Sequence, residues 1–262
     1  MSATETVLIT GASSGIGLEL AKCFAKDGSR LILVARNTDA LEKLAEELRR
    51  ENKIEAIVLT ADLSQPETPK RIFDELSARK TVVNVLVNNA GFGAIGSFDE
   101  LPRERQLEMI QVNVTALTDL TRLFLPGMIE RHRGGILNVA SVAGFVTGPG
   151  MAVYYATKAF VLSFTEAIAA ETRNTGIYVS TLCPGPTPTN FGAVAGSKNV
   201  KLIRVSRTSV QKVARDGHKA FRYHHVVCIS GFQNKFLVLL IRLAPRWLIR
   251  RIVLKFNGFP RR

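Results

Sequence analysis

The stretch TGASSGIG at residues 10–17 decides the fold, and it follows the apolar run Val7-Leu8-Ile9. Three glycines between a buried strand and a helix let the backbone turn tightly and approach a pyrophosphate closely. The N-terminus of the helix that follows, expected from Ile16 to about Lys26, supplies amide donors and partial positive charge. The spacing G-x-x-x-G-x-G is not the commoner G-x-G-x-x-G, and no Gly-Lys-Ser/Thr makes it a P-loop. We interpret it as a dinucleotide site, with an ordinary glycine turn as the alternative.

Strands and helices alternate after this turn. Apolar runs predict strands over 31–34, 54–59, 82–87, 136–139 and 177–182, and helical spacing predicts helices over 38–51, 65–78, 101–124 and 153–172. Runs this rich in Val, Ile and Leu are typical of parallel strands buried on both faces. The pattern predicts one domain, 1–262, with a doubly wound, Rossmann-like α/β fold that binds ligands at the carboxyl ends of its strands.

The end of the second predicted strand bears on the choice of cofactor. An NAD enzyme usually has an acid there, which binds the ribose 2′-hydroxyl. Here the residue is Arg36, a partner for a 2′-phosphate, so NADP(H) is favoured over NAD(H). Asp39 follows by three residues and suits the first turn of a helix. A solvated surface charge is the alternative for Arg36.

A second group of residues suggests proton chemistry at the same edge of the sheet. Tyr154 and Lys158 are four residues apart on a predicted helix and share one face. A nearby ammonium is expected to lower the pKa of the phenol and make it a usable acid and base. Ser141, just past a strand, could hold a carbonyl oxygen beside the Tyr154 hydroxyl. Residues 88–91 (NNAG) end another strand at this edge, and Asn113 is a polar residue inside a long predicted helix.

Together these motifs resemble the short-chain dehydrogenase/reductase family in its common short form, over roughly residues 6–190. The resemblance rests on TGASSGIG, Asp62, NNAG, Asn113, Ser141, Tyr154-x-x-x-Lys158 and Pro184-Gly185 in family order. It implies a sheet of about seven parallel strands. It also implies a homodimer or homotetramer formed through the helices near 101–124 and 153–172.

The resemblance assigns roles to four catalytic residues. It implies that Tyr154 is the general acid and base and that Ser141 orients the substrate carbonyl. Lys158 would hold the nicotinamide ribose and tune Tyr154, and Asn113 would position a water in a proton relay. Taken singly, each has an alternative interpretation: Ser141 as an ordinary loop hydroxyl, and Asn113 as a buried polar residue hydrogen-bonded to the backbone.

The same resemblance defines the expected cofactor site. Asp62 would bind the adenine, Asn89 would shape the site, and Pro184-Gly185 with Thr189 would flank the nicotinamide. The full set shares positions in the family motifs and comprises Gly11, Ser13, Ser14, Gly15, Ile16, Gly17, Arg36, Asp62, Leu63, Asn89, Ala90, Gly91, Tyr154, Lys158, Pro184, Gly185, Thr187 and Thr189. No metal site is expected.

The substrate pocket is expected from the segments after the fourth, fifth and sixth strands. Beside Ser141 they offer Phe92, Phe145 and Phe191, and none up to Val194 places a cation other than Lys158 near the carbonyl. We therefore expect a small apolar, lipid-like ketone, aldehyde or secondary alcohol. A non-catalytic protein that senses NADP(H) or is tethered to a membrane is the alternative function.

The net charge of +13 is confined to the end of the chain. Residues 1–193 hold 19 basic and 21 acidic side chains, whereas residues 194–262 hold 16 basic and one acidic. The chain therefore does not have the charge distribution of a nucleic-acid-binding protein, and no nucleic-acid partner is expected. Three widely spaced cysteines and the lack of a secretory signal predict a cytoplasmic protein, with membrane association as the alternative.

The last quarter departs most from a generic family member. Residues 186–225 are expected to form a substrate loop or lid, with Ser206 capping a helix to about Phe221. Residues 233–262 form a basic amphipathic segment, read as two helices separated near Pro245. Arg242, Arg246 and Arg250 are spaced as a stripe opposite apolar residues. Either the apolar face packs on the domain and the arginines are solvated, or the segment contacts an anionic membrane.

Overall fold

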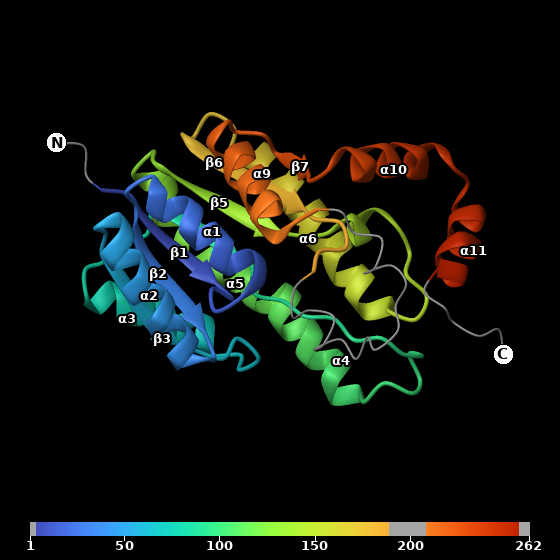
Figure 1. The fold of residues 1–262 in the computed structure, drawn as a ribbon, viewed down its shortest axis with the longest axis horizontal. Helices are drawn as coiled ribbons and strands as arrows, with labels where there is room; N and C mark the ends of the chain where they lie inside the picture. The colour runs from blue at the N-terminus through green and yellow to red at the C-terminus, as the bar shows by residue number, and fades with distance from the viewer. Residues whose placement is uncertain (1–3, 189–207, 257–262) are drawn as a thin grey trace.

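The computed structural model describes residues 4–188 and 208–256, and its centre is a seven-stranded parallel sheet (Figure 1). The strand order is β3-β2-β1-β4-β5-β6-β7, and every neighbouring pair is parallel. The strands are β1 (Thr6–Thr10), β2 (Arg30–Ala35), β3 (Ala56–Thr60), β4 (Val85–Asn88), β5 (Gly134–Val139), β6 (Ile177–Cys183) and β7 (Val227–Ile229). The predicted doubly wound, Rossmann-like fold is confirmed.

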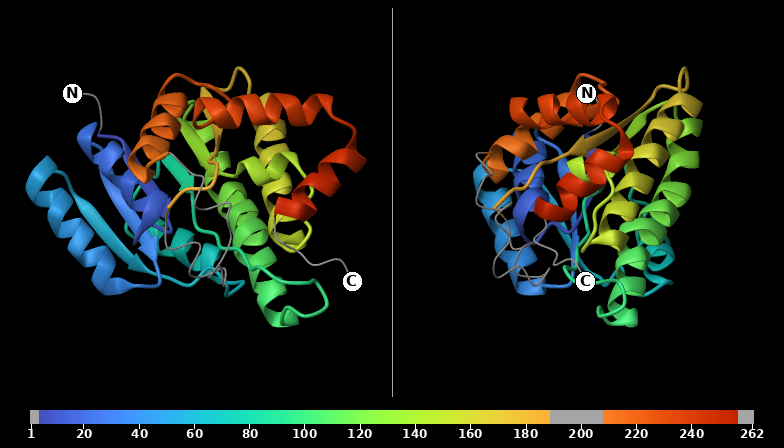
Figure 2. Two further views of the ribbon diagram at one scale, coloured as in Figure 1. Left: turned by 45° about the vertical axis from the view of Figure 1, so that its right-hand side comes forward. Right: turned by 90° about the vertical axis from the view of Figure 1, so that its right-hand side faces the viewer.

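Helices cover both faces of this sheet, as the right-hand view of Figure 2 shows. One face carries α1 (Gly15–Lys26), α2 (Thr38–Asn52) and α9 (Val210–Arg222). The other carries α3 (Thr68–Ala78), α5 (Ala116–Glu130) and α6 (Ala152–Glu171). Within β1, Val7 and Ile9 point into the first of these cores and Leu8 into the second, and all three are fully buried. The continuous apolar run therefore reflects burial on two sides.

The helix predicted over 101–124 is interrupted and longer than expected. It consists of α4 (Arg103–Ile110), a π-helical turn η1 (Gln111–Thr115) and α5, which continues through Pro126 to Glu130. Proline removes one backbone hydrogen bond, which normally favours a helix end. Here Phe124 and Met128, on either side of Pro126, are buried against the sheet, and this packing maintains the helix.

The C-terminal part differs from the expectation at its first helix. The N-cap of α9 is Ser209, whose side chain accepts a hydrogen bond from the Lys212 amide at 3.2 Å, whereas Ser206 lies outside the described residues. The two predicted last helices are present as α10 (Phe232–Leu243) and α11 (Arg246–Phe256). Because α10 ends at Leu243 and a new helix begins at Arg246, Arg242 does not share a helix with Arg246. Among the described residues, no helix has the length and apolarity needed to cross a bilayer.

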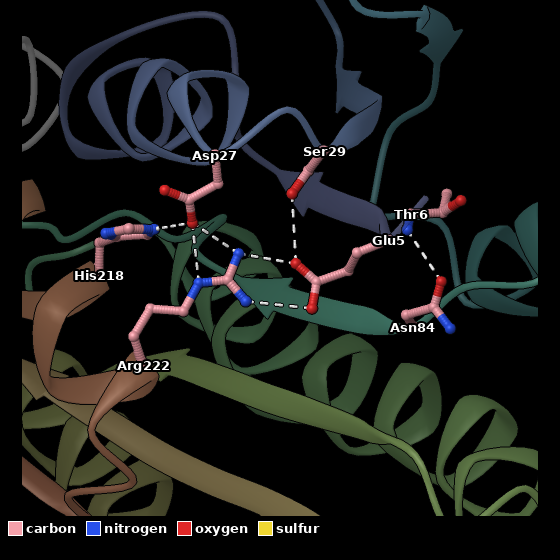
Figure 3. A network of polar contacts seen from close by, with 7 residues as sticks. All are labelled: Glu5, Thr6, Asp27, Ser29, Asn84, His218 and Arg222. Carbon is pink, nitrogen blue, oxygen red and sulfur yellow. Dashed lines mark hydrogen bonds and ion pairs between the residues drawn. The ribbon is translucent and has the colours of Figure 1, made fainter. Parts of the chain in front are cut away.

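An ionic network ties α9 to the start of the fold (Figure 3). The Arg222 guanidinium donates to both carboxylate oxygens of Glu5, at 2.7 and 3.0 Å, and to Asp27 at 2.8 Å. His218 lies 2.8 Å from the same Asp27 oxygen, and the Ser29 hydroxyl donates to Glu5. Burial lowers the pKa of Arg222, but the hydrogen bonds and charges of Glu5 and Asp27 raise it by more, so the net effect is a raised pKa. The network holds together residues that are about two hundred positions apart.

We expect Arg222→Met to lower the free energy of unfolding by about 2 kcal/mol, because it leaves two half-buried carboxylates without their cation. For a chain of this size that corresponds to a fall in Tm of about 4–8 °C. The matched control is Arg79→Met, which removes an exposed pair with Glu75 and should cost no more than about 0.5 kcal/mol. Urea denaturation measures both, and equal values for the two variants would contradict a structural role of the network.

Candidate active site

The glycine turn has the geometry that a dinucleotide site needs. Gly11 and Gly15 have φ values of 65° and 58°, which other residues rarely adopt. A Cβ at Gly17 would collide with the Gly11 carbonyl oxygen, so α1 begins in close contact with the turn. Ser14 is the N-cap of α1, but its side chain makes no cap hydrogen bond. The amides at this helix start therefore suit a pyrophosphate.

Asn89 fastens this turn to the end of β4. Its side-chain amide donates to the carbonyl oxygens of Thr10 at 2.9 Å and Gly11 at 3.2 Å. The backbone amides of Asn89 and Ala90 both donate to the Thr10 hydroxyl at 3.0 Å. The two Asn residues of NNAG thus differ in their surroundings, since Asn88 is buried in the sheet and Asn89 is bonded to the glycine turn.

The residues expected around the adenosine lie at the carboxyl ends of β2 and β3. Arg36 is exposed, and its guanidinium lies 3.9 Å from a Glu108 carboxylate oxygen. Asp39 is in the first turn of α2, as predicted. Asp62 accepts a hydrogen bond from the Ser64 amide at 3.0 Å. The Leu63 side chain is buried in the core, so a cofactor contact would come from its backbone.

Ser141 and Tyr154 meet beyond the end of β5. Ser141 is the N-cap of a short 3-10 helix, η2 (Val142–Phe145), and accepts a hydrogen bond from the Ala143 amide at 3.1 Å. Its hydroxyl donates to the Pro184 carbonyl oxygen at 3.3 Å. The side chains of Ser141 and Tyr154 are hydrogen-bonded to each other. Two hydroxyls thus lie side by side, as binding of one carbonyl oxygen requires.

Lys158 and Asn113 are the other two predicted catalytic residues, and both lie close to Gly91. The Lys158 ammonium is buried and donates to the Val139 carbonyl oxygen at 2.8 Å. Asn113 lies in the π-helical turn η1, where its amide donates to Phe92 O at 2.9 Å and its oxygen accepts from Phe92 N at 3.1 Å. A Cβ placed on Gly91 would lie 3.0 Å from Asn113 Oδ1 and 3.4 Å from Lys158 Nζ. The three residues are therefore in close proximity.

The expected lowering of the Tyr154 pKa is not present in this structure. Burial raises the pKa of Tyr154 to about 12, and the hydrogen bond with Ser141 only partly opposes this. Burial also lowers the pKa of Lys158 to about 8. The sequence-based prediction was wrong because desolvation of the phenol dominates its pKa. The Lys158 ammonium lies 5.9 Å from the Tyr154 ring centre and donates its hydrogen bond to the Val139 carbonyl oxygen. Tyr154 is accordingly a protonated phenol at neutral pH, which suits a proton donor.

Part of the expected nicotinamide and substrate region is described. The Thr187 hydroxyl donates to the Gly185 carbonyl oxygen at 2.9 Å. Thr189 and Phe191 lie outside the described residues. Phe145 is half-buried and packs partly on a core cluster. The Phe92 side chain is likewise half-buried.

Sequence reasoning did not predict that three residues, Arg105, Arg242 and Asn234, lie next to this region. Arg105 lies over the Phe92 ring at 3.9 Å, and Arg242 of α10 lies over the Phe145 ring at 5.6 Å. Asn234, also on α10, is so close to Gly185 that a Cβ there would collide with its amide. No local spacing links these partners, which are distant in sequence. The basic C-terminal segment therefore borders the active site.

Comparison with known proteins identifies the same family that the sequence motifs resemble. The model of the short chain dehydrogenase family matches residues 5–199. A short chain dehydrogenase of Pseudocercospora fijiensis is 35% identical over 72% of this chain, and the match spans 62% of its own length. The very-long-chain 3-oxoacyl-CoA reductase of Rattus norvegicus is 30% identical over 97% of this chain and 80% of its own.

Two solved structures are similar over nearly the whole fold. A short-chain dehydrogenase from Sphingobium yanoikuyae in complex with NADPH has a TM-score of 0.82 and 34% identity, and the match covers 90% of this chain and 92% of that one. A short chain dehydrogenase/reductase from Burkholderia phymatum in complex with NAD has a TM-score of 0.81 and 28% identity, with the same coverage. The neighbours thus include complexes with both nicotinamide cofactors.

Proposed function

Because this chain belongs to the short chain dehydrogenase family, we propose that it is an NADP(H)-dependent carbonyl reductase or alcohol dehydrogenase. The observation that carries the proposal is the meeting of Ser141, Tyr154, Lys158 and Asn113 at the sheet edge that holds the glycine turn. A protein that only sensed the cofactor would have no need of a paired Ser141 and Tyr154.

The proposed reaction is transfer of a hydride between nicotinamide and a carbonyl carbon, with the proton handled by the protein. The bound cofactor supplies the hydride. Tyr154, protonated at neutral pH, donates its proton to the carbonyl oxygen while Ser141 holds that oxygen by a hydrogen bond. Lys158 would hold the nicotinamide ribose, and its ammonium places a positive charge 5.9 Å from the Tyr154 ring centre. Asn113 would position a water that returns a proton to Tyr154, and in the π-helical turn its side-chain amide is hydrogen-bonded to the backbone of Phe92.

We propose an apolar, lipid-like substrate. Phe92 and Phe145 offer aromatic surface beyond the catalytic hydroxyls, which suits a substrate held by burial. The similarity to a very-long-chain 3-oxoacyl-CoA reductase over 97% of this chain supports the same class. The guanidinium groups of Arg105 and Arg242, stacked on these rings, would also favour a substrate with an anionic end.

NADPH oxidation with a panel of ketones and aldehydes of increasing chain length tests this function. We expect turnover that rises with chain length, because each added methylene buries more apolar surface. NADPH binding without turnover of any carbonyl would instead favour the sensing protein. Preference for the shortest, most polar carbonyls would contradict the substrate class.

The preference for NADP(H) rests on Arg36. We expect Arg36→Ala to lower kcat/KM for NADPH about 10–100-fold, because a charge-assisted pair with the 2′-phosphate is lost, and to leave the value for NADH nearly unchanged. Steady-state kinetics with both cofactors measure this. The control, Arg50→Ala, removes another exposed arginine at the far end of α2 and should change neither value. A parent enzyme that prefers NADH would contradict the assignment.

We also propose that the protein is a homodimer or homotetramer. Leu107 and Ile110 on α4 and Phe160 on α6 are large apolar side chains exposed on the two helices expected at such an interface. Covering them would remove apolar surface from water.

A further inference from the structure

Helix α10 presents its apolar face to the solvent. Six large side chains on it are between 48% and 83% exposed, namely Phe232, Phe236, Leu237, Leu239, Leu240 and Leu243. Their spacing places them within a single arc of the helix surface. This is the reverse of an ordinary surface helix, whose apolar stripe packs on the core. The alternative in which the apolar face packs on the domain is therefore wrong for these residues.

The other side of α10 is the one docked on the domain. Val238 is buried, Asn234 lies against Gly185, and Arg242 lies over Phe145. These contacts fix the orientation of the helix, so its exposed stripe is held outward. In Figure 1, α10 and α11 lie at the edge of the molecule, at the upper right.

Helix α11 extends this surface. Trp247, Leu248 and Ile252 are each more than a third exposed, and Arg251 lies over the Trp247 ring at 5.3 Å. We call the nine exposed apolar residues of the two helices the α10–α11 surface.

The charge around the α10–α11 surface has one sign. Residues 232–254 include no acidic residue, and their exposed cations are Lys235, Arg242, Arg246, Arg250 and Arg251. Two copies of this surface paired about a two-fold axis would bring together like charges with no carboxylate to neutralise them. An anionic plane with an apolar interior satisfies both the cations and the exposed side chains.

We propose that the α10–α11 surface docks on the anionic face of a lipid bilayer. Helix α10 has 12 residues and is about 18 Å long, shorter than the ~30 Å hydrocarbon core, so the helix lies in the interface and does not cross it. Its apolar side chains enter the boundary between headgroups and acyl chains, and the arginines and the lysine remain at the phosphates. Because the opposite side of the same helix contacts Gly185 and Phe145, docking would place the active site close to the membrane.

Vesicle flotation of the full chain tests the proposal. The probes are phosphatidylcholine vesicles with and without phosphatidylglycerol, each at low and high salt. We expect binding to the anionic vesicles at low salt, weaker binding at high salt, and little binding to phosphatidylcholine alone. Failure of the parent protein to bind anionic vesicles at low salt would overturn the proposal.

Two sets of variants separate the apolar and the charged contributions. Leu239→Glu with Leu243→Glu should lower the partition coefficient at least tenfold, roughly the loss of buried apolar surface at two positions. Arg246→Gln with Arg250→Gln should lower it about fivefold for each arginine removed. The control is Val82→Glu, which places a charge on an exposed apolar residue near β4, outside this surface, and should leave binding unchanged.

Sedimentation velocity without lipid identifies the rival occupant. Concentration-dependent self-association that is abolished by Leu239→Glu with Leu243→Glu, together with unchanged vesicle binding of that variant, would assign the surface to a second copy and overturn the proposal. NADPH binding, measured in every variant, shows that the domain is folded. It also makes the test independent of the proposed catalytic activity.

Discussion

Tyr154→Phe should lower kcat/KM for carbonyl reduction by about 10²–10⁴-fold, the contribution typical of a positioned proton donor. The ring remains, so the packing against Tyr155 is retained and only the hydroxyl bound to Ser141 is lost. NADPH affinity, measured by fluorescence titration, should stay within about threefold, because the glycine turn and Arg36 are untouched. The loss should fall mainly on kcat, since the proton is transferred in the transition state.

The matched control is Tyr155→Phe, one residue further along α6. Its ring is buried and packs against Gly148, whereas the hydroxyl that is hydrogen-bonded to Ser141 belongs to Tyr154. We expect this variant to retain activity within about tenfold of the parent. Equal losses in both variants would point to a general disturbance of α6, and normal activity of Tyr154→Phe would rule out the proposed mechanism.

The position of the site was predictable because its motifs are local and the sheet is parallel. TGASSGIG and NNAG begin at the last residues of β1 and β4, and Ser141 lies two residues after β5. The carboxyl ends of parallel strands share one edge of the sheet. The helical spacing of Tyr154 and Lys158 then needs only one turn of α6 to place both on one face. No long-range information was required for these residues.

Features that depend on distant contacts were not predictable. The partners of Arg222 are Glu5 and Asp27, which no local spacing connects to it. The outward orientation of the α10 stripe depends on which side docks at Gly185 and Phe145. The Tyr154 pKa was predicted in the wrong direction because sequence spacing shows that a cation is near but not how deeply the phenol is buried.

Lys158→Met should reduce activity and raise stability at the same time. We expect kcat/KM to fall by about 10²–10³-fold, because the charge beneath the site and a partner for the ribose are both lost. Burial lowers the Lys158 pKa from 10.5 to about 8, so holding the ammonium in the folded protein costs on the order of 3 kcal/mol. Methionine removes that cost but leaves the Val139 carbonyl oxygen without its donor. The net gain should be about 1–2 kcal/mol, or about 3–6 °C in Tm.

The pH dependence of that gain identifies its cause. Below pH 8, Lys158 is charged in both the folded and the unfolded parent, and the full cost of burying the ammonium is present. Between pH 8 and 10.5 the folded protein binds fewer protons than the unfolded chain, so the stability contributed by this group rises with pH. The Tm difference between Lys158→Met and the parent should therefore be largest below pH 8 and shrink toward pH 10. Two outcomes would contradict this cause. A Tm difference that stays constant over this pH range would mean that the gain comes from packing of the methionine. A variant that is less stable than the parent at every pH would show that the bond to Val139 outweighs the cost of the buried charge.

Loss of activity combined with the pH-dependent gain in Tm would show that the fold tolerates an unfavourable buried cation, as expected where a charge is retained for catalysis.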